Sequence, residues 1–353
     1  ATGLLAAVIV ALSPPIVYFA KTANVEMPML FWAAVGLWFL IRLLDEHRLR
    51  DYLGFAFCAA ASIVTKDQAY ALWLLTPFVI VPALARHRRE ERGEALATDS
   101  RVGVREILRA LVDVRLLGVL GVGLVVAVFA YRLPWNWAGL VRHVETLLGP
   151  QSQEAKAFPA TLAGYGACLV QNGRDLAFCL GGFFWLVPFA VLSAITTSQG
   201  KERRGFAALG VVGLSYFGLF LAPILFSRDR YVLPLVLVLA PLCARALRSW
   251  LAPDPSLVTE VRVRRFLVGV GFFSTAVSLG LSLWNAIALD AKMVNDVRYH
   301  IEQTLRKEGA EKTALGLGRA KHLPRLAHYA SWARAESEIR RRRPPRLVVN
   351  LVD

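Results

Sequence analysis

Three short charged segments interrupt the long apolar stretches of this chain, at residues 21–26, 66–67 and 227–230. Each contains at least one Lys or Arg and at least one Asp or Glu. A charged side chain at the centre of a bilayer costs about 2.5–3.5 kcal/mol on the insertion scale, so such residues usually face a cavity, a partner or the interface. If the three segments lie on one side of a membrane, their side chains can line one site.

The composition is that of a membrane protein. The 353 residues are 56% hydrophobic and only 19% charged, with a mean hydropathy of +0.47. Soluble domains are about 45–50% apolar and about 25% charged. The sequence therefore predicts an all-α polytopic membrane protein, and it excludes an ordinary soluble one. The net charge is +15. The basic residues lie between apolar spans and do not form a patch with interleaved aromatic residues, so we expect no nucleic-acid partner.

A helix of about 20 residues crosses the hydrocarbon core of about 30 Å. By that measure the sequence predicts about nine transmembrane helices, at 3–20, 28–44, 53–65, 69–85, 116–132, 176–196, 206–226, 231–248 and 266–287. A single helix over 52–85 would be about 50 Å long, which is too long for one crossing. We expect this run to be a hairpin whose tip, Lys66 and Asp67, faces outward.

The basic residues predict which side of the membrane each loop occupies. Most of them fall in alternate loops, including eight arginines from Arg86 to Arg115. The positive-inside rule places those loops in the cytoplasm. The three charged segments, the loop 133–175 and the C-terminal tail are then extracytoplasmic. Within that loop, residues 140–148 predict a short amphipathic helix.

Two domains are expected: a transmembrane domain over 1–287 and a small extracytoplasmic α/β tail over 288–353. In the tail, the pattern predicts a helix at 294–307 and strands at 313–317 and 346–352. The chain begins in an apolar span without an initiator Met, and it ends directly after a predicted strand. We therefore expect it to be a piece of a longer protein with an incomplete tail.

Four cysteines, Cys58, Cys168, Cys179 and Cys243, show no CxxC spacing. We interpret them as small buried hydrophobic residues. A disulfide between Cys168 and Cys179 is the alternative if both face an oxidising compartment.

The charged segments lie in runs that resemble a known family. Residues 12–28, with Leu12-Ser13-Pro14-Pro15 and an acidic residue two before a Pro, are similar to a Pro-containing helix of the GT-C polyprenyl-phosphate-sugar glycosyltransferases. The closer resemblance is to the branch of protein O-mannosyltransferases and lipid A aminoarabinose transferases. Ser62 to Gln68 resembles that family's small-residue helix ending in Thr-Lys-Gly, and residues 228–234 resemble its Arg-Tyr-Leu-Leu-Pro helix entry.

Three differences from the family stand out. The family's general-base Asp in the first outer loop would precede Ala1 and is absent from this chain. Glu26 stands where the family usually has Asp, and Asp67 replaces the Gly after the Lys. This chain therefore need not contain the catalytic base.

The resemblance implies transfer of a sugar from a polyprenyl-phosphate donor to an acceptor at the outer face of the cytoplasmic membrane. The acceptor, whether protein, lipid or glycan, is not identified. The chemistry needs a carboxylate to take a hydroxyl proton and cations to hold the departing phosphate, and the Arg fork suits phosphate oxygens. We assign these residues as candidates: Glu26 as catalytic; Lys66, Arg228, Arg230 and Tyr231 as donor-phosphate binding; Lys21, Asp67 and His143 as further site residues. No cofactor is assigned, and a divalent metal is left open.

Simpler interpretations stay open at this point. Glu26 could pair with Lys21 at the interface, Lys66 with Asp67 at a turn, and Arg228 and Arg230 could anchor their helix in the headgroup region. His143 and Glu145 are two residues apart and would not share a helix face as metal ligands. A transporter or flippase of lipid-linked glycans is the alternative function, but we find no internal repeat of the kind common in transporters. The enzyme hypothesis predicts that Glu26, Lys66, Arg228 and Arg230 converge in one outward-facing cavity.

Overall fold

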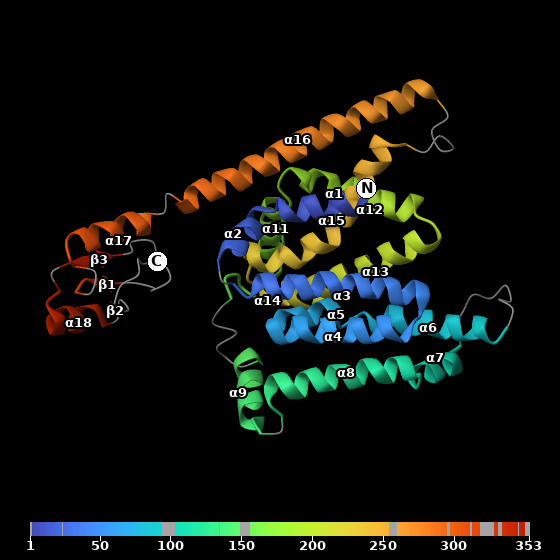
Figure 1. Ribbon diagram of the computed structural model, residues 1–353, viewed down its shortest axis with the longest axis horizontal. Helices are drawn as coiled ribbons and strands as arrows, with labels where there is room; N and C mark the ends of the chain where they lie inside the picture. Colours follow the sequence, from blue (N-terminus) through green and yellow to red (C-terminus); the bar gives the residue numbers. More distant parts are fainter. Residues whose placement is uncertain are drawn as a thin grey trace. The chain divides into compact units, whose positions relative to one another are not determined.

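A computed structural model of the chain shows an all-α polytopic membrane protein (Figure 1). The structure describes residues 2–22, 24–93, 103–133, 135–148, 156–253, 260–294, 297–310, 313–317, 328–330, 334–344 and 346–349. The chain divides into two compact units, residues 1–286 and 287–353.

The elements of the first unit, within its described residues, are all helices. Its elements are α1 (Thr2–Ala11), α2 (Pro14–Lys21), α3 (Glu26–Glu46), α4 (Leu49–Thr65), η1 (Asp67–Ala69), α5 (Tyr70–Trp73), α6 (Pro77–Glu91), α7 (Val104–Leu111), α8 (Val114–Tyr131), α9 (Trp137–Leu148), α11 (Leu162–Leu180), η2 (Gly181–Leu186), α12 (Val187–Thr197), α13 (Gly200–Tyr216), η3 (Phe217–Leu221), α14 (Ala222–Ile224), α15 (Asp229–Leu251) and α16 (Val261–Val294), which continues into the second unit.

Seven helical segments in the described residues are long and apolar enough to cross a membrane, or eight if the bent pair α1 and α2 counts as one span. These two helices meet at an angle of 66°. The sequence predicts about nine crossings, and the difference is α4. With 17 residues, α4 is about 25 Å long at 1.5 Å per residue, shorter than the hydrocarbon core.

The turn predicted within 52–85 is confirmed. Helix α4 ends at Thr65, and Lys66 has an extended backbone, with φ −157° and ψ 119°. The chain then returns alongside α4: the Trp73 indole donates a hydrogen bond to Ser62 Oγ (2.9 Å), and the Trp73 ring lies 5.5 Å from the Phe55 ring. The side of the membrane that this turn faces stays a prediction.

Helix α15 is the central helix of the first unit, and α1, α11, α12 and α13 pack against it. Eleven of its residues are buried, including Val232, Leu233 and Val236. Helix α11 begins at Leu162, inside the loop predicted for 133–175. That loop is therefore shorter than predicted, because the polar residues Gln171, Asn172 and Asp175 belong to a helix. The amphipathic helix predicted at 140–148 is present as α9.

The three charged segments lie at one end of the first unit. In Figure 1, α3 begins at this end, α4 and α8 finish here, and α15 starts here after the short helix α14. The opposite end contains the end of α3, the start of α4 and the junction of α6 with α7. Because successive long helices run in opposite directions, segments that are far apart in the sequence lie at the same end of the first unit.

The second unit contains α17 (Val297–Lys307), β1 (Leu315–Leu317), β2 (His328–Ala330), α18 (Ala335–Arg342) and β3 (Leu347–Val349). The strands form a parallel sheet in the order β2-β1-β3, with Leu315 opposite His328 and Leu347. The predicted helix and both predicted strands are present in shorter form, and residues 350–352 of the second strand lie outside the described residues. Strand β2 and helix α18 were not predicted from the sequence.

All four cysteines are buried and free. Cys168 and Cys179 both belong to α11, where a separation of 11 residues along the helix keeps their side chains too far apart to be bonded. The alternative disulfide is thus wrong, and burial as small apolar side chains is confirmed.

Candidate functional site

Glu26 is the first residue of α3 and its side chain is only 1% exposed. The backbone turns before it at Asn24, whose Oδ1 accepts a hydrogen bond from the Glu26 N–H (3.2 Å). A carboxylate in the first turn of a helix is stabilised by the unpaired N–H groups and the positive end of the helix dipole. The break between α2 and α3 therefore buries an acidic side chain at a helix start.

Lys66 reaches Glu26 from the break between α4 and η1. Its Nζ donates a hydrogen bond to Glu26 Oε1, and its side chain is 17% exposed. Helix α4 ends directly before Lys66, whose N–H still bonds the Ser62 carbonyl (3.0 Å). The extended backbone at Lys66 releases its side chain from the helix face.

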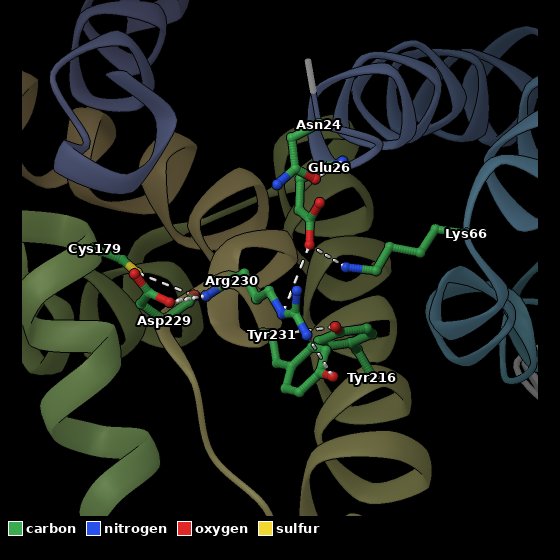
Figure 2. A network of polar contacts seen from close by, with 8 residues as sticks. All are labelled: Asn24, Glu26, Lys66, Cys179, Tyr216, Asp229, Arg230 and Tyr231. Carbon is green, nitrogen blue, oxygen red and sulfur yellow. Dashed lines mark hydrogen bonds and ion pairs between the residues drawn. The ribbon is translucent and has the colours of Figure 1, made fainter. Parts of the chain in front are cut away.

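Arg230 reaches the same carboxylate from the first turn of α15. Its Nε lies 3.9 Å from Glu26 Oε1, which is therefore shared between two cations from different helices (Figure 2). Arg230 is held at its base by the hydrogen bond from its own N–H to Asp229 Oδ1 (2.7 Å) and at its tip by the one from Nη2 to Tyr231 Oη (3.3 Å).

Tyr231 forms an aromatic surface beneath the two cations. Lys66 Nζ lies 5.4 Å from its ring centre, and the Arg230 guanidinium carbon lies 5.0 Å from it. The buried Tyr216 of α13 donates its hydroxyl to the Tyr231 carbonyl (2.7 Å), which fixes the first turn of α15 (Figure 2). Cation–π contacts at such distances stabilise positive charge in a place with little water. We call Glu26, Lys66, Arg230 and Tyr231 the site cluster.

The site cluster carries one negative charge for two positive charges. Glu26 Oε2 is buried and has no hydrogen-bond partner among the described residues, and the same holds for Arg230 Nε. Buried polar atoms are nearly always hydrogen-bonded in proteins, and an unpaired one costs about 1–3 kcal/mol. Both the surplus cation and the unpaired atoms suit an anionic ligand with hydroxyl groups.

The other candidate residues lie apart from these contacts. The exposed Arg228 stacks over the Phe226 ring at 5.1 Å. Asp67 pairs with His143 of α9 (Oδ1 to Nε2, 3.0 Å), and both are more than one-third exposed. Lys21 is the last residue of α2.

The local pairings considered at the sequence level are replaced by longer-range ones. Glu26 contacts Lys66 and Arg230 in place of a pairing with Lys21, and Lys66 does not cap a turn with Asp67, because each has a different partner. Glu26, Lys66 and Arg230 therefore come together as predicted, Arg228 is not among the contacts of Glu26, and an outward-facing cavity at this place stays a prediction.

The sequence reasoning missed several residues of this site. Tyr216 is in an apolar run, where nothing marks it, and Asn24 is one of several polar residues before α3. A second network was also missed: the Ser227 hydroxyl contacts Asn172 Oδ1 (2.6 Å) and Asp175 Oδ2 (2.5 Å) of α11. These contacts fix the segment that leads into Arg228 and Arg230. Polar residues at 171, 172 and 175 were a usable signal, since they interrupt an otherwise apolar helix.

No metal ligands are assigned. Across the part of the chain that the structure describes, no group of three or more His, Cys, Asp and Glu side chains is arranged to hold a metal ion. His143 pairs with Asp67, and within the described ranges it forms no metal-binding group with Glu145.

Residues 1–97 match the family model of dolichyl-phosphate-mannose-protein mannosyltransferases. This segment includes Glu26 and Lys66, whereas Arg230 and Tyr231 lie beyond it. No curated protein and no solved structure matches the chain. The match supports a membrane glycosyltransferase of the GT-C type.

Proposed function

We propose that this chain is the membrane part of a glycosyltransferase that takes a sugar from a polyprenyl-phosphate donor. The acceptor stands at the outer face of the cytoplasmic membrane, on the side of the three charged segments. One observation carries the proposal: Glu26, Lys66 and Arg230, from three separate segments of an apolar bundle, meet through one carboxylate oxygen. The family match over residues 1–97 supports the same chemistry.

Each residue of the site cluster has a role in this proposal. Lys66 and Arg230 bind the donor phosphate, because together they offer several N–H donors next to a surplus positive charge. Tyr231 supports both cations from below. Glu26 holds the cations in place through Oε1, and its unpaired Oε2 is the atom left to accept a hydrogen bond or a proton from the acceptor hydroxyl.

Arg228 has a lesser role than its sequence neighbour. It is exposed and stacked on Phe226, whereas Arg230 is in contact with the carboxylate. Asp67 and His143 join α9 to the turn at Lys66, so they help to hold this turn in place. The proposal needs no metal among these residues.

The test uses membranes that contain the protein, supplied with a radiolabelled polyprenyl-phosphate mannose as probe. Lys66→Ala and Arg230→Ala should each lower donor-dependent transfer about 10- to 100-fold, because each removes a charged hydrogen bond to phosphate worth about 1.5–3 kcal/mol. Arg228→Ala should lower it less.

Arg245→Ala is the matched control, since Arg245 of α15 also forms an ion pair with a residue of another helix, Glu202 of α13 (2.7 Å). It should leave transfer within about twofold of the wild type. Equal losses in Arg245→Ala and Arg230→Ala would contradict the site assignment, and movement of intact labelled lipid across the membrane without sugar transfer would favour a flippase.

A further inference from the structure

The charge balance of the site cluster implies a preference between two kinds of phosphate. Lys66 and Arg230 contribute two positive charges and the shared Glu26 carboxylate contributes one negative charge. A phosphodiester carries one negative charge, whereas a phosphomonoester carries about 1.5–2 at pH 7. One added negative charge neutralises the three groups, and a second is left without compensation.

An uncompensated charge is costly at this place. Glu26 is 1% exposed, Lys66 17% and Arg230 36%, so water reaches the shared carboxylate poorly. Removal of a charge from water is unfavourable unless an opposite charge replaces the lost hydration. The Tyr231 ring, which lies against both cations, supplies no positive charge.

These two forms of phosphate are the donor and the product of the proposed reaction. The acceptor oxygen bonds to the anomeric carbon while the bond from that carbon to the phosphate oxygen breaks. The electron pair of the broken bond stays on the phosphate oxygen, and the hydroxyl proton leaves through a base to water. A phosphodiester thereby becomes a phosphomonoester, with a second negative charge on the lipid phosphate.

We propose that Glu26 sets the charge selectivity of this site, so that it binds a lipid phosphodiester in preference to the corresponding lipid phosphomonoester and thereby releases the product. This inference rests on the proposed function, but it concerns a separate property. Two cations alone would hold the dianionic product more tightly than the donor. The buried carboxylate between them lowers the affinity for the second charge.

The test compares two probes that differ by one methyl group and therefore in charge: farnesyl phosphate, a monoester, and farnesyl methyl phosphate, a diester. The purified protein in detergent is titrated with each, and the ratio of the two Kd values is the readout. The wild type should bind the diester more tightly at pH 7.5. Glu26→Gln, a neutral side chain of the same shape, should shift the ratio by about tenfold or more towards the monoester, because one close charge–charge repulsion is removed.

Glu202→Gln is the control, since Glu202 also pairs with an arginine of α15 but lies in the first turn of α13. Its Kd ratio should equal that of the wild type. If Glu26→Gln changes both Kd values by the same factor, the carboxylate is structural and the inference is wrong. If the wild type binds neither probe, the proposed function itself fails.

A second measurement needs no mutation. Between pH 7.5 and 5.5 the monoester dianion takes up one proton and becomes a monoanion, so its affinity for the wild type should approach that of the diester. The diester controls for changes in the charged and titratable protein groups at the site, which are Glu26, Lys66, Arg230, Tyr231 and, bonded to the Tyr231 carbonyl, Tyr216. A Kd ratio that stays constant over this range would overturn the inference even if Glu26→Gln fails to fold.

Discussion

The two ends of the first unit both contain buried carboxylates, but they share charge in opposite ways. At the site cluster one carboxylate, Glu26, is shared by two cations. At the other end one cation, Arg42, is shared by two carboxylates: its Nε lies 3.0 Å from Asp51 and its Nη2 lies 3.2 Å from Glu46. The first arrangement has a surplus positive charge, whereas the second is balanced, because Arg48 also pairs with Glu46 at 3.0 Å.

The partners also differ in their distance along the chain. Arg42 and Asp51 are nine residues apart and close the turn between α3 and α4. Lys66 is 40 residues from Glu26, and Arg230 comes from α15, much later in the chain. Local ion pairs of the first kind follow from the hairpin itself. The convergence at Glu26 requires three helix ends to be placed together, which makes it the better candidate for a binding site.

The largest expected effect is on the stability of the protein after loss of the shared carboxylate. Glu26→Ala should lower the free energy of unfolding by about 3–5 kcal/mol, because it leaves buried Lys66 without its partner. Glu46→Ala at the other end should cost about 0–1 kcal/mol, since Glu46 is one-third exposed. Thermal unfolding in detergent measures both. Similar losses in the two variants would show that the two ends are equivalent.

A smaller effect concerns pH at the end opposite the site cluster. His47, which follows α3, is buried, stacks on His87 at 4.2 Å between ring centres and has its Nδ1 3.1 Å from Tyr52 Oη. Burial lowers the pKa of His47 from 6.5 to about 4, and the nearby charges of His87, Arg115 and Arg204 act in the same direction, with Glu91 opposing them. The folded protein therefore resists protonation of this ring.

The sign of the effect follows from proton linkage. Below pH 6.5 the unfolded chain binds a proton that the folded chain excludes, so stability is complete above about pH 6.5 and falls as the pH approaches 4. Between pH 7.5 and 5 the loss should be about 1–2 kcal/mol. In His47→Asn, which tolerates the left-handed backbone at this position (φ 48°), the slope should be smaller. An unchanged slope would assign the pH effect to other groups.

The sequence was sufficient to predict the breaks in the helices. Lys66 and Asp67 interrupt an apolar run that is too long for one span, and the structure has a turn there. Length and polarity along the chain carry that information, since a bilayer has a fixed thickness. The strands around 315–317 and 347–349 were predictable for a similar reason, because short β-branched and apolar runs lie beside proline and polar residues.

Side-chain partners were harder to predict than the breaks. Lys21, Lys66, Arg228 and Arg230 are all plausible partners for Glu26 from the sequence, and only the packing of α4 and α15 against α3 selects two of them. Arg228 and Arg230 illustrate the reason. Arg228 precedes α15, has an extended backbone and stacks on Phe226. Arg230 lies in the first turn of α15 and reaches Glu26. A difference of two residues at a helix start changes the direction of the side chain.

The smallest expected effect separates burial from distance along the chain. Arg204 of α13 and Asp45 of α3 are 159 residues apart and pair at 3.1 Å, so this contact is as long-range as those of Glu26. Arg204 is 53% exposed, however, and water screens its charge. Arg204→Ala should change the free energy of unfolding by less than about 1 kcal/mol and leave the Kd of either farnesyl probe unchanged. Thermal unfolding at low and high salt measures this, and the difference from the wild type should shrink as salt is added. If Arg204→Ala destabilises as strongly as Glu26→Ala, ion pairs between helices far apart in the sequence stabilise the protein whether or not they are buried. The burial of Glu26 would then not explain its larger effect.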